Sequence, residues 1–149
     1  MRFTTKTEYG LVCLMYVARY GASSPLSLVT ITDIVKAERF SEAYVAKILN
    51  RLRTANIVKS HHGKQGGYLL ARPASQITFK DVIEALEGQT FEVFCLPKTR
   101  NEIVCTHFDL CRLSPIWNRT KEILDQFYDS VTLEMMAKST GRQGKNLLA

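Results

Sequence analysis

Three of the four cysteines lie close together in the second half of the chain, at Cys95, Cys105 and Cys111. Nine residues separate the first two and five separate the second two. Zinc ribbons and dithiol redox motifs use close C-x-x-C pairs, so the spacing matches neither. Three thiolates in one stretch suit an iron–sulfur cluster, which usually has four protein ligands. A zinc site with one further ligand, or a thiol sensor without metal, fits this spacing as well.

The stretch from Phe94 to Ser114, which we call the cysteine segment, is expected to be a loop. Long loops without secondary structure are uncommon in small domains unless they are functional or disordered. We therefore expect a metal centre to order the cysteine segment and to control what the preceding part of the chain does. The fourth cysteine, Cys13, falls within a predicted helix, where a small buried apolar residue is its usual role.

The positive charge is concentrated in one quarter of the chain. Residues 36–72 contain eight basic and two acidic residues, so this segment carries +6, which is the net charge of the whole protein. A localised basic surface favours a polyanionic partner. A solvated face rich in lysine and arginine would give the same count.

The length and hydropathy of the chain limit its class. A chain of 149 residues is long enough to bury a core without disulfide bonds. No stretch approaches the ~20 apolar residues of a membrane span. The apolar run at residues 11–18 is short and is not followed by a cleavage site of small residues. We therefore expect a cytoplasmic protein, in which clustered cysteines more often bind metal or react than form disulfides.

Two short helices in the basic segment are expected to form a helix-turn-helix. The first begins near Thr32, and Arg39-Phe40 turns the chain. Ser41 then caps a helix from Glu42 to about Ala55. Its apolar residues follow one helical stripe and its opposite face is small, polar and basic, with the stripe at Val45, Ile48, Leu49 and Leu52. Alanines near its start would let this helix sit deep in a major groove.

A β-hairpin is expected directly after this helix. Residues 57–60 and 68–71 look like strands, and residues 61–67 contain three glycines that tolerate positive φ. The tip carries His62, Lys64 and Gln65 beside the Gly66 and Gly67 amides, groups that suit a phosphate backbone or a minor groove. A helix-turn-helix followed by a basic hairpin is a winged helix, and this combination predicts binding to double-stranded DNA.

Three further helices are predicted around these elements. Thr5 and Glu8 have the form of a capping box that starts a helix to about Tyr20. Thr78 caps a second helix that ends at Gly88. Ser114-Pro115 begins a third, which runs to about Asp129. Its apolar stripe is wide and aromatic, and pairing with a second copy of the chain would bury it.

The fold expected from these elements is mainly α with a small β-hairpin wing, a winged helix-turn-helix with a long C-terminal dimerisation helix. We divide the chain into a DNA-binding domain at residues 1–88, the cluster-binding loop at 89–114, the dimerisation helix and a terminal turn at 115–138, and a flexible tail at 139–149.

The whole arrangement resembles the IscR/NsrR/RirA family of winged-helix, iron–sulfur-dependent bacterial regulators. The resemblance runs from Met1 to about Lys138. Its carriers are the opening M-R-F-T-x-x-T-E-Y-G, the block S-E-A-Y-V-A-K-I-L-N-R-L-R, the wing G-K-Q-G-G-Y-L-L-A-R-P, the helix I-T-F-K-D-V-I-E-A-L-E-G and the three cysteines ending in C-R-L. It implies a homodimer in which the state of an iron–sulfur cluster sets DNA affinity.

The resemblance implies that Cys95, Cys105 and Cys111 bind the cluster, but it leaves the fourth ligand open. One branch of the family has a histidine three residues after the third cysteine, where this chain has Ser114. Nitric-oxide-sensing members use an aspartate from the first helix of the partner subunit, and the matching residue here is Glu8. We favour Glu8, with His107, Asp109, water or a small thiol as alternatives. Neither the cluster nuclearity nor the sensed signal follows from the sequence.

The expected DNA contacts fall into two groups, and His62 stands where the family often has arginine. The recognition helix would read bases with Ser41, Ala43, Tyr44, Ala46, Lys47 and Arg51, and the wing region would hold the backbone or minor groove with Lys59, His62, Lys64, Gln65, Gly66 and Gly67. The partner is expected to be a pseudo-palindromic operator. A redox enzyme or electron carrier is the rival class, but the chain has no nucleotide-binding loop or catalytic triad spacing to support it.

Overall fold

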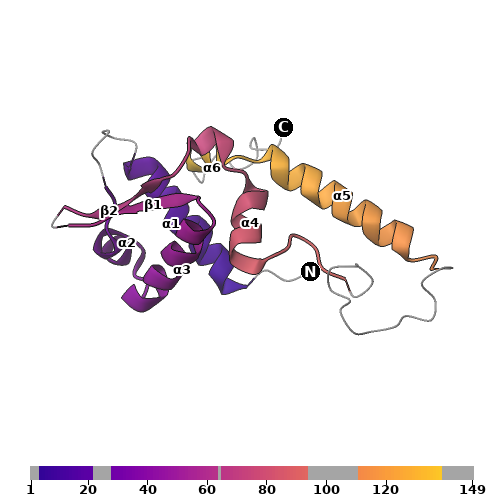
Figure 1. The fold of residues 1–149 in the computed structure, drawn as a ribbon, viewed down its shortest axis with the longest axis horizontal. Helices are drawn as coiled ribbons and strands as arrows, with labels where there is room; N and C mark the ends of the chain where they lie inside the picture. The colour runs from indigo at the N-terminus through magenta and orange to yellow at the C-terminus, as the bar shows by residue number, and fades with distance from the viewer. Residues whose placement is uncertain (1–3, 22–27, 64, 94–110, 139–149) are drawn as a thin grey trace.

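The computed structural model describes residues 4–21, 28–63, 65–93 and 111–138. The cysteine positions 95 and 105 and the wing residue Lys64 therefore lie outside the described residues. Within the described ranges the fold is mainly helical, with a two-stranded antiparallel hairpin (Figure 1). The elements in order are α1 (Thr5–Tyr20), α2 (Ile31–Glu38), α3 (Glu42–Thr54), β1 (Val58–His61), β2 (Gly67–Leu70), η1 (Ala74–Gln76), α4 (Phe79–Glu87), α5 (Ser114–Ser130) and α6 (Leu133–Lys138).

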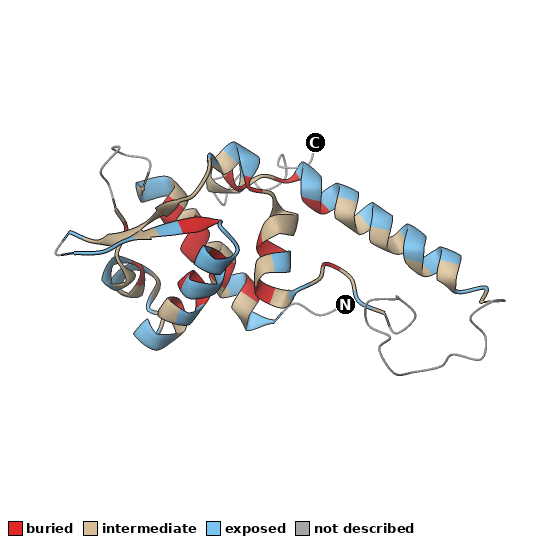
Figure 2. Ribbon diagram, in the orientation of Figure 1, coloured by how far each residue is buried: buried red, intermediate tan, exposed pale blue. Residues whose placement is uncertain are grey.

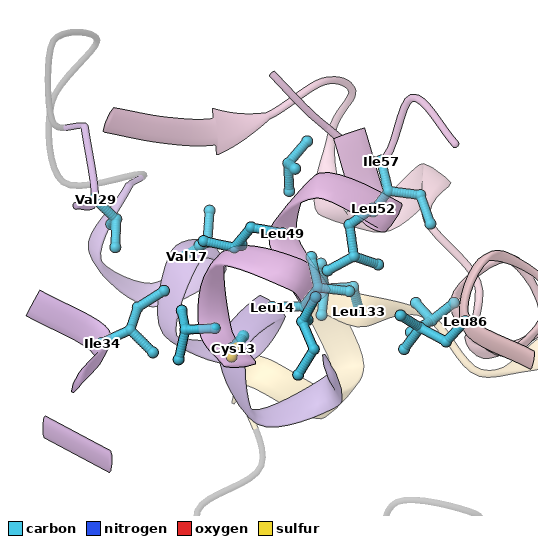
Figure 3. Packing of buried hydrophobic residues seen from close by; sticks show 14 of the residues in the cluster. Cys13, Leu14, Val17, Val29, Ile34, Leu49, Leu52, Ile57, Leu86 and Leu133 are labelled. Carbon is cyan, nitrogen blue, oxygen red and sulfur yellow. The ribbon is translucent and has the colours of Figure 1, made fainter. Parts of the chain in front are cut away.

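Helix α1 lies at the centre of the core, packed against α3, α4 and α6. Its fully buried side chains include Cys13, Leu14 and Val17. Figure 3 shows Cys13 within the apolar cluster, near Leu14. The prediction that Cys13 is a small core residue is confirmed. Burial, with a smaller contribution from the charge of Glu38, raises the pKa of its thiol to about 12, so the thiol stays protonated.

The helix-turn-helix forms as expected, with one correction at its start. Helix α2 begins one residue before the predicted Thr32, and its N-cap is Thr30, which forms a capping box with Asp33. Arg39 ends α2 in the left-handed conformation, with φ of 57°. Helix α3 follows from Glu42, and the four residues of its predicted apolar stripe are all buried.

The hairpin of β1 and β2 forms the wing, and the extended chain around Val29, just before α2, pairs with its second strand. Val58 pairs with Leu70 and His61 with Gly67 at the two ends of the hairpin. Val29 also exchanges two backbone hydrogen bonds with Tyr68, of 2.9 and 2.8 Å. A Cβ at Gly67 would lie 2.9 Å from the Val29 carbonyl oxygen. Gly67 is therefore required for this close approach of the two backbones.

The predicted capping box at the start of α1 is wrong. Thr5 is the first residue of the helix, and Thr4 is the N-cap without a capping bond from its side chain. The Thr4 hydroxyl instead donates to the Glu87 carboxylate at the end of α4. Glu87, a residue distant in the sequence, thus binds the threonine that caps α1. Glu8 takes no part in the cap and lies on the exposed side of α1.

Helix α4 matches its prediction, and α5 starts differently. Thr78 and Asp81 form the capping box of α4, and Gly88 ends it with φ of 97°. Ser114 is inside α5 rather than its N-cap, a position that Leu113 takes. Helix α5 extends away from the rest of the molecule (Figure 1), while α6 packs on α1 and buries Leu133. No helix in the described ranges is long and apolar enough to cross a bilayer.

Candidate functional site

Helix α3 presents a polar, basic side to solvent. Its buried stripe fixes the rotation of the helix, because the four stripe residues have no more than 1% of their surface exposed. The opposite side leaves Ser41, Ala43 and Lys47 exposed, with Ala46 partly so. These small and basic residues form one continuous face that could enter a groove of a nucleic acid.

An aromatic cluster ties the start of α3 to α1. Tyr9 stacks on Phe40 with ring centroids 4.2 Å apart. The same Tyr9 ring meets Tyr44 edge-on at 5.5 Å. The ring of Tyr44 is therefore part of the contact with α1, in addition to lying near the candidate nucleic-acid face. Tyr9 directly follows Glu8, so the residue next to Glu8 in α1 contacts the start of α3.

Arg51 has a partner within the protein. Its Nη1 donates a 3.1 Å hydrogen bond to the carbonyl oxygen of Leu86, near the end of α4. Arg72, another of the eight basic residues, pairs with the Asp81 carboxylate at 2.8 Å. Two of the basic residues that suggested an anionic partner thus make contacts inside the fold.

The wing tip is exposed and its glycines have structural roles. His62 and Gln65 are both exposed, as is Lys59 on β1. The Gly66 amide donates a 2.9 Å hydrogen bond to the Gly63 carbonyl inside the turn, so it is engaged within the protein. The side chains of Lys59, His62 and Gln65 are exposed groups of the wing that could meet a partner.

Of the predicted metal ligands, the structure describes Cys111 and Glu8. Cys111 is partly exposed and lies just before α5, in contrast to the buried Cys13. Glu8 is exposed near the start of α1. Among the described residues no group of three histidine, cysteine or acidic residues could hold a metal ion. The donor set that the sequence predicts includes Cys95 and Cys105, which lie outside those residues.

The chain that leads into the cysteine segment is fixed to α5. Thr90 is buried and its hydroxyl donates to the Asp125 carboxylate. Phe91 contacts the Trp117 ring at a centroid distance of 6.2 Å. Burial raises the pKa of Asp125, but hydrogen bonds from Lys121 and Thr90 outweigh it and lower the pKa below its usual range. Both the approach to the cysteine segment and its last residues, including Cys111, are therefore attached to one helix.

Glu87 joins the same region to α1, and nothing in its local sequence singles it out. It accepts hydrogen bonds from Thr4 and Thr7 and pairs with Lys6 at 3.1 Å. Burial raises the pKa of Glu87, but the hydrogen bonds from these three residues outweigh it and lower the pKa from 4.5 to about 2. The carboxylate stays charged and holds the start of α1 against the end of α4.

Helix α5 leaves much of its apolar stripe uncovered. Figure 2 shows its buried part only at the end nearest the body, where Tyr128 packs edge-on against Phe79 at 5.2 Å. The stripe residues Ile116, Ile123 and Phe127 are 55%, 51% and 43% exposed. An apolar face of this size is typical of a protein–protein contact.

Comparison with known proteins identifies the class of this chain. A family model named Rrf2 and described as an iron-dependent transcriptional regulator matches residues 3–139. The regulator IscR of Xenorhabdus nematophila is 30% identical over 139 residues, which cover 93% of this chain and 80% of that protein. The regulator CymR of Bacillus subtilis is 31% identical over 144 residues, covering 94% and 92% of the two chains.

Solved structures agree with this assignment. The structure of CymR, the global cysteine regulator of B. subtilis, superposes with a TM-score of 0.73 at 27% identity, covering 94% of this chain and 98% of that one. IscR of T. potens superposes with a TM-score of 0.67 at 27% identity, covering 96% and 91%. These named relatives are transcriptional regulators rather than enzymes. The chain belongs to the Rrf2 family of DNA-binding transcriptional regulators.

Proposed function

We propose that this regulator is a homodimer whose affinity for a DNA operator is controlled by an iron–sulfur cluster bound by Cys95, Cys105 and Cys111. The observation that carries the proposal is the contrast between its cysteines. Cys13 is fully buried with a strongly raised thiol pKa, whereas Cys111 is partly exposed beside the start of α5. Three cysteines within seventeen residues form a donor set suited to such a cluster.

The DNA would be held by α3 and the wing. In this proposal Ser41, Ala43, Ala46 and Lys47 face the bases of a major groove, with Tyr44 at the edge of that face. In the wing region the side chains of Lys59, His62, Lys64 and Gln65 would contact the phosphate backbone or minor groove, because the Gly66 amide is already bound within the turn. The exposure of Lys59, His62 and Gln65 supports this placement. Each phosphate neutralised lowers the slope of log affinity against log salt by about 0.9.

A second copy of the chain would cover the apolar side of α5. The exposed Ile116, Ile123 and Phe127 support this pairing, and a two-fold dimer is the commonest oligomer. Two-fold symmetry implies a pseudo-palindromic operator with half-sites ~34 Å apart, or a multiple of that distance. The same proposal places the protein in the cytoplasm, with DNA and its own second copy as partners.

The fourth cluster ligand is proposed to be the partner subunit's Glu8. Because Thr4 rather than Thr5 is the N-cap of α1, Glu8 lies one residue beyond the position that a capping box uses, and its carboxylate is not committed to one. The bound cluster would supply a reactive group whose loss or modification changes the order of the cysteine segment. The protein's own residues would carry that change through α5 and the end of α4, to which the flanks of the segment are attached.

The proposal is tested by the ultraviolet–visible spectrum of protein purified without oxygen. An iron–sulfur cluster gives a brown protein that absorbs visible light and contains acid-labile sulfide in an amount that matches its iron. A colourless protein that contains zinc or no metal would contradict it.

A thiol switch is the second candidate. The likeness to CymR, a protein named as a global cysteine regulator, favours it over the electron-carrier class. In that case the protein is colourless and its operator affinity responds to thiol oxidation and recovers with a reductant.

A further inference from the structure

The end of α4 lacks hydrogen-bond donors of its own, and an arginine from another helix supplies one. The last four carbonyls of an α-helix have no partner inside the helix. The carbonyl of Leu86, the penultimate residue of α4, is one of these. Nη1 of Arg51 reaches it from α3 at 3.1 Å. A positive charge at this place also complements the negative end of the helix dipole.

The carbonyl that Arg51 binds is held in place by α1. A Cβ at Gly10 would overlap Cδ1 of Leu86, so the two helices approach closely here. The next residue, Glu87, is bound by Thr4, Thr7 and Lys6. The end of α4 is thus held by several contacts with α1. The hydrogen bond of Arg51 connects α3 to this end of α4.

The same end of α4 leads directly toward the cysteine segment. Gly88 ends the helix, and Thr90 is already bound to Asp125 of α5. Six residues separate Glu87 from Phe94, where the cysteine segment begins. A change in that segment that moves the end of α4 would therefore move the Leu86 carbonyl and, through it, α3.

We propose that Arg51 is a positioning residue, which sets the placement of α3 from the end of α4 and does not neutralise a DNA phosphate. This differs from the sequence-based expectation that Arg51 contacts the operator. Its part in sensing rests on the proposed cluster control. The placement of α3 itself rests only on the contact between Arg51 and Leu86.

The alternative is that the remaining N–H groups of the guanidinium bind DNA, since arginine has five donors. The salt dependence of binding separates the two roles. A lost phosphate contact changes the salt slope by about 0.9, whereas a misplaced helix loses affinity with the slope unchanged. A misplaced recognition helix also weakens specific binding far more than non-specific binding.

The experiment compares Arg51→Gln, Arg51→Lys and Lys59→Gln as full-length proteins. The probes are a duplex of about 30 base pairs, long enough for two half-sites, selected by the wild-type protein from a random pool, and a random-sequence duplex. For Arg51→Gln we expect about tenfold weaker binding to the selected duplex, an unchanged salt slope and unchanged binding to the random duplex. Arg51→Lys should restore part of the loss, because a lysine can still donate to the carbonyl. Lys59→Gln removes a proposed contact to the DNA backbone, so it should reduce the slope and weaken binding to both duplexes.

The proposal is overturned if Arg51→Gln reduces the salt slope as Lys59→Gln does, or if Arg51→Gln leaves both the affinity and the slope at their wild-type values. Circular dichroism and the thermal midpoint show that each variant is folded before binding is compared.

A second measurement tests the sensing role of Arg51 by comparing the operator affinities of cluster-loaded and cluster-free protein. The ratio of their affinities for the selected duplex should approach one in Arg51→Gln and stay at the wild-type value in Lys59→Gln. If Arg51→Gln keeps the full ratio, the sensing role of Arg51 is overturned while cluster control stands. If the cluster-loaded and cluster-free forms of the wild-type protein bind with equal affinity, the proposed cluster control is wrong. The salt slope still decides whether Arg51 positions α3.

Discussion

The hydroxyl of Thr7 in α1 lies 2.5 Å from Oε1 of Glu87, the last residue of α4. These residues are 80 positions apart in the chain. Their contact joins the helix that carries Glu8 to the helix that leads toward the cysteine segment. Tyr9 of α1 contacts Tyr44 of α3, and Arg51 of α3 binds the Leu86 carbonyl of α4, so contacts link each pair of these three helices.

The Glu87 contact predicts a pH-dependent loss of stability. The pKa of Glu87 is lowered from 4.5 to about 2 in the folded protein. Its contribution is therefore fully present above pH 4.5 and is lost as the pH falls from 4.5 toward 2. Glu87→Gln should lower the free energy of unfolding at pH 7 by about 1–3 kcal/mol, and the difference from wild type should vanish near pH 2.

The control for this variant is Glu84→Gln, which changes an exposed glutamate on the same helix. It should alter stability by less than about 0.5 kcal/mol. Both are measured by urea unfolding at one protein concentration, because dimer stability depends on concentration. A Glu87→Gln effect of the same size at pH 7 and pH 3 would contradict the assignment.

The cysteines should separate into two classes on substitution. Cys105→Ala and Cys111→Ala should give colourless, folded dimers with changed operator affinity, because each removes a proposed cluster ligand. Cys13→Ala should keep the cluster spectrum and lose only about 1 kcal/mol of stability, since it removes a small buried group. Absorption, iron content and sulfide content are the measurements. A coloured Cys105→Ala protein with wild-type affinity would leave that cysteine without the proposed role.

The fourth ligand is tested at Glu8. If the partner subunit's Glu8 completes the site, Glu8→Gln should shift the cluster absorption and shorten the cluster lifetime in air. Glu84→Gln, another exposed glutamate, should leave both unchanged. Wild-type spectrum and lifetime in Glu8→Gln would move the fourth ligand to His107, Asp109 or a group from solution.

If the apolar face of α5 is the dimer interface, a charge introduced there should dissociate the dimer. Ile123→Lys places a charge on a side chain that is 51% exposed in the single chain and that the proposed dimer would bury. It should shift the sedimentation of the protein from dimer to monomer and weaken operator binding. Gln126→Lys, at an exposed polar position on the same helix, should remain a dimer. A dimeric Ile123→Lys protein would place the subunit contact elsewhere.

The elements that local pattern determines could be predicted from the sequence. The stripe of α3 was found because Val45, Ile48, Leu49 and Leu52 repeat at helical spacing, and all four are buried. The capping box of α4 at Thr78 was found because its two partners are three residues apart.

The contacts between distant residues could not be predicted in this way. At the start of α1 the local pattern favours Thr5 as the N-cap, because Glu8 lies three residues on. The choice is made by Glu87, more than 80 positions away. The sequence predicts a DNA contact for Arg51 because the residue lies on the basic side of α3. Its partner in the structure is a backbone carbonyl 35 positions further along the chain. Every residue has a backbone carbonyl, so the sequence cannot single this one out. The predicted function came from the resemblance to a family. The contacts that connect α1, α3 and α4 came from the structure.

The central claim is that the cluster controls DNA affinity, and one titration tests it most directly. A single oxygen-free preparation is divided, and one half is stripped of its cluster by a chelator. Both halves are titrated against the selected duplex at the same salt concentration and pH. The account predicts dissociation constants that differ by about tenfold or more, a coupling of at least ~1.4 kcal/mol. Equal dissociation constants for two folded dimers would contradict it.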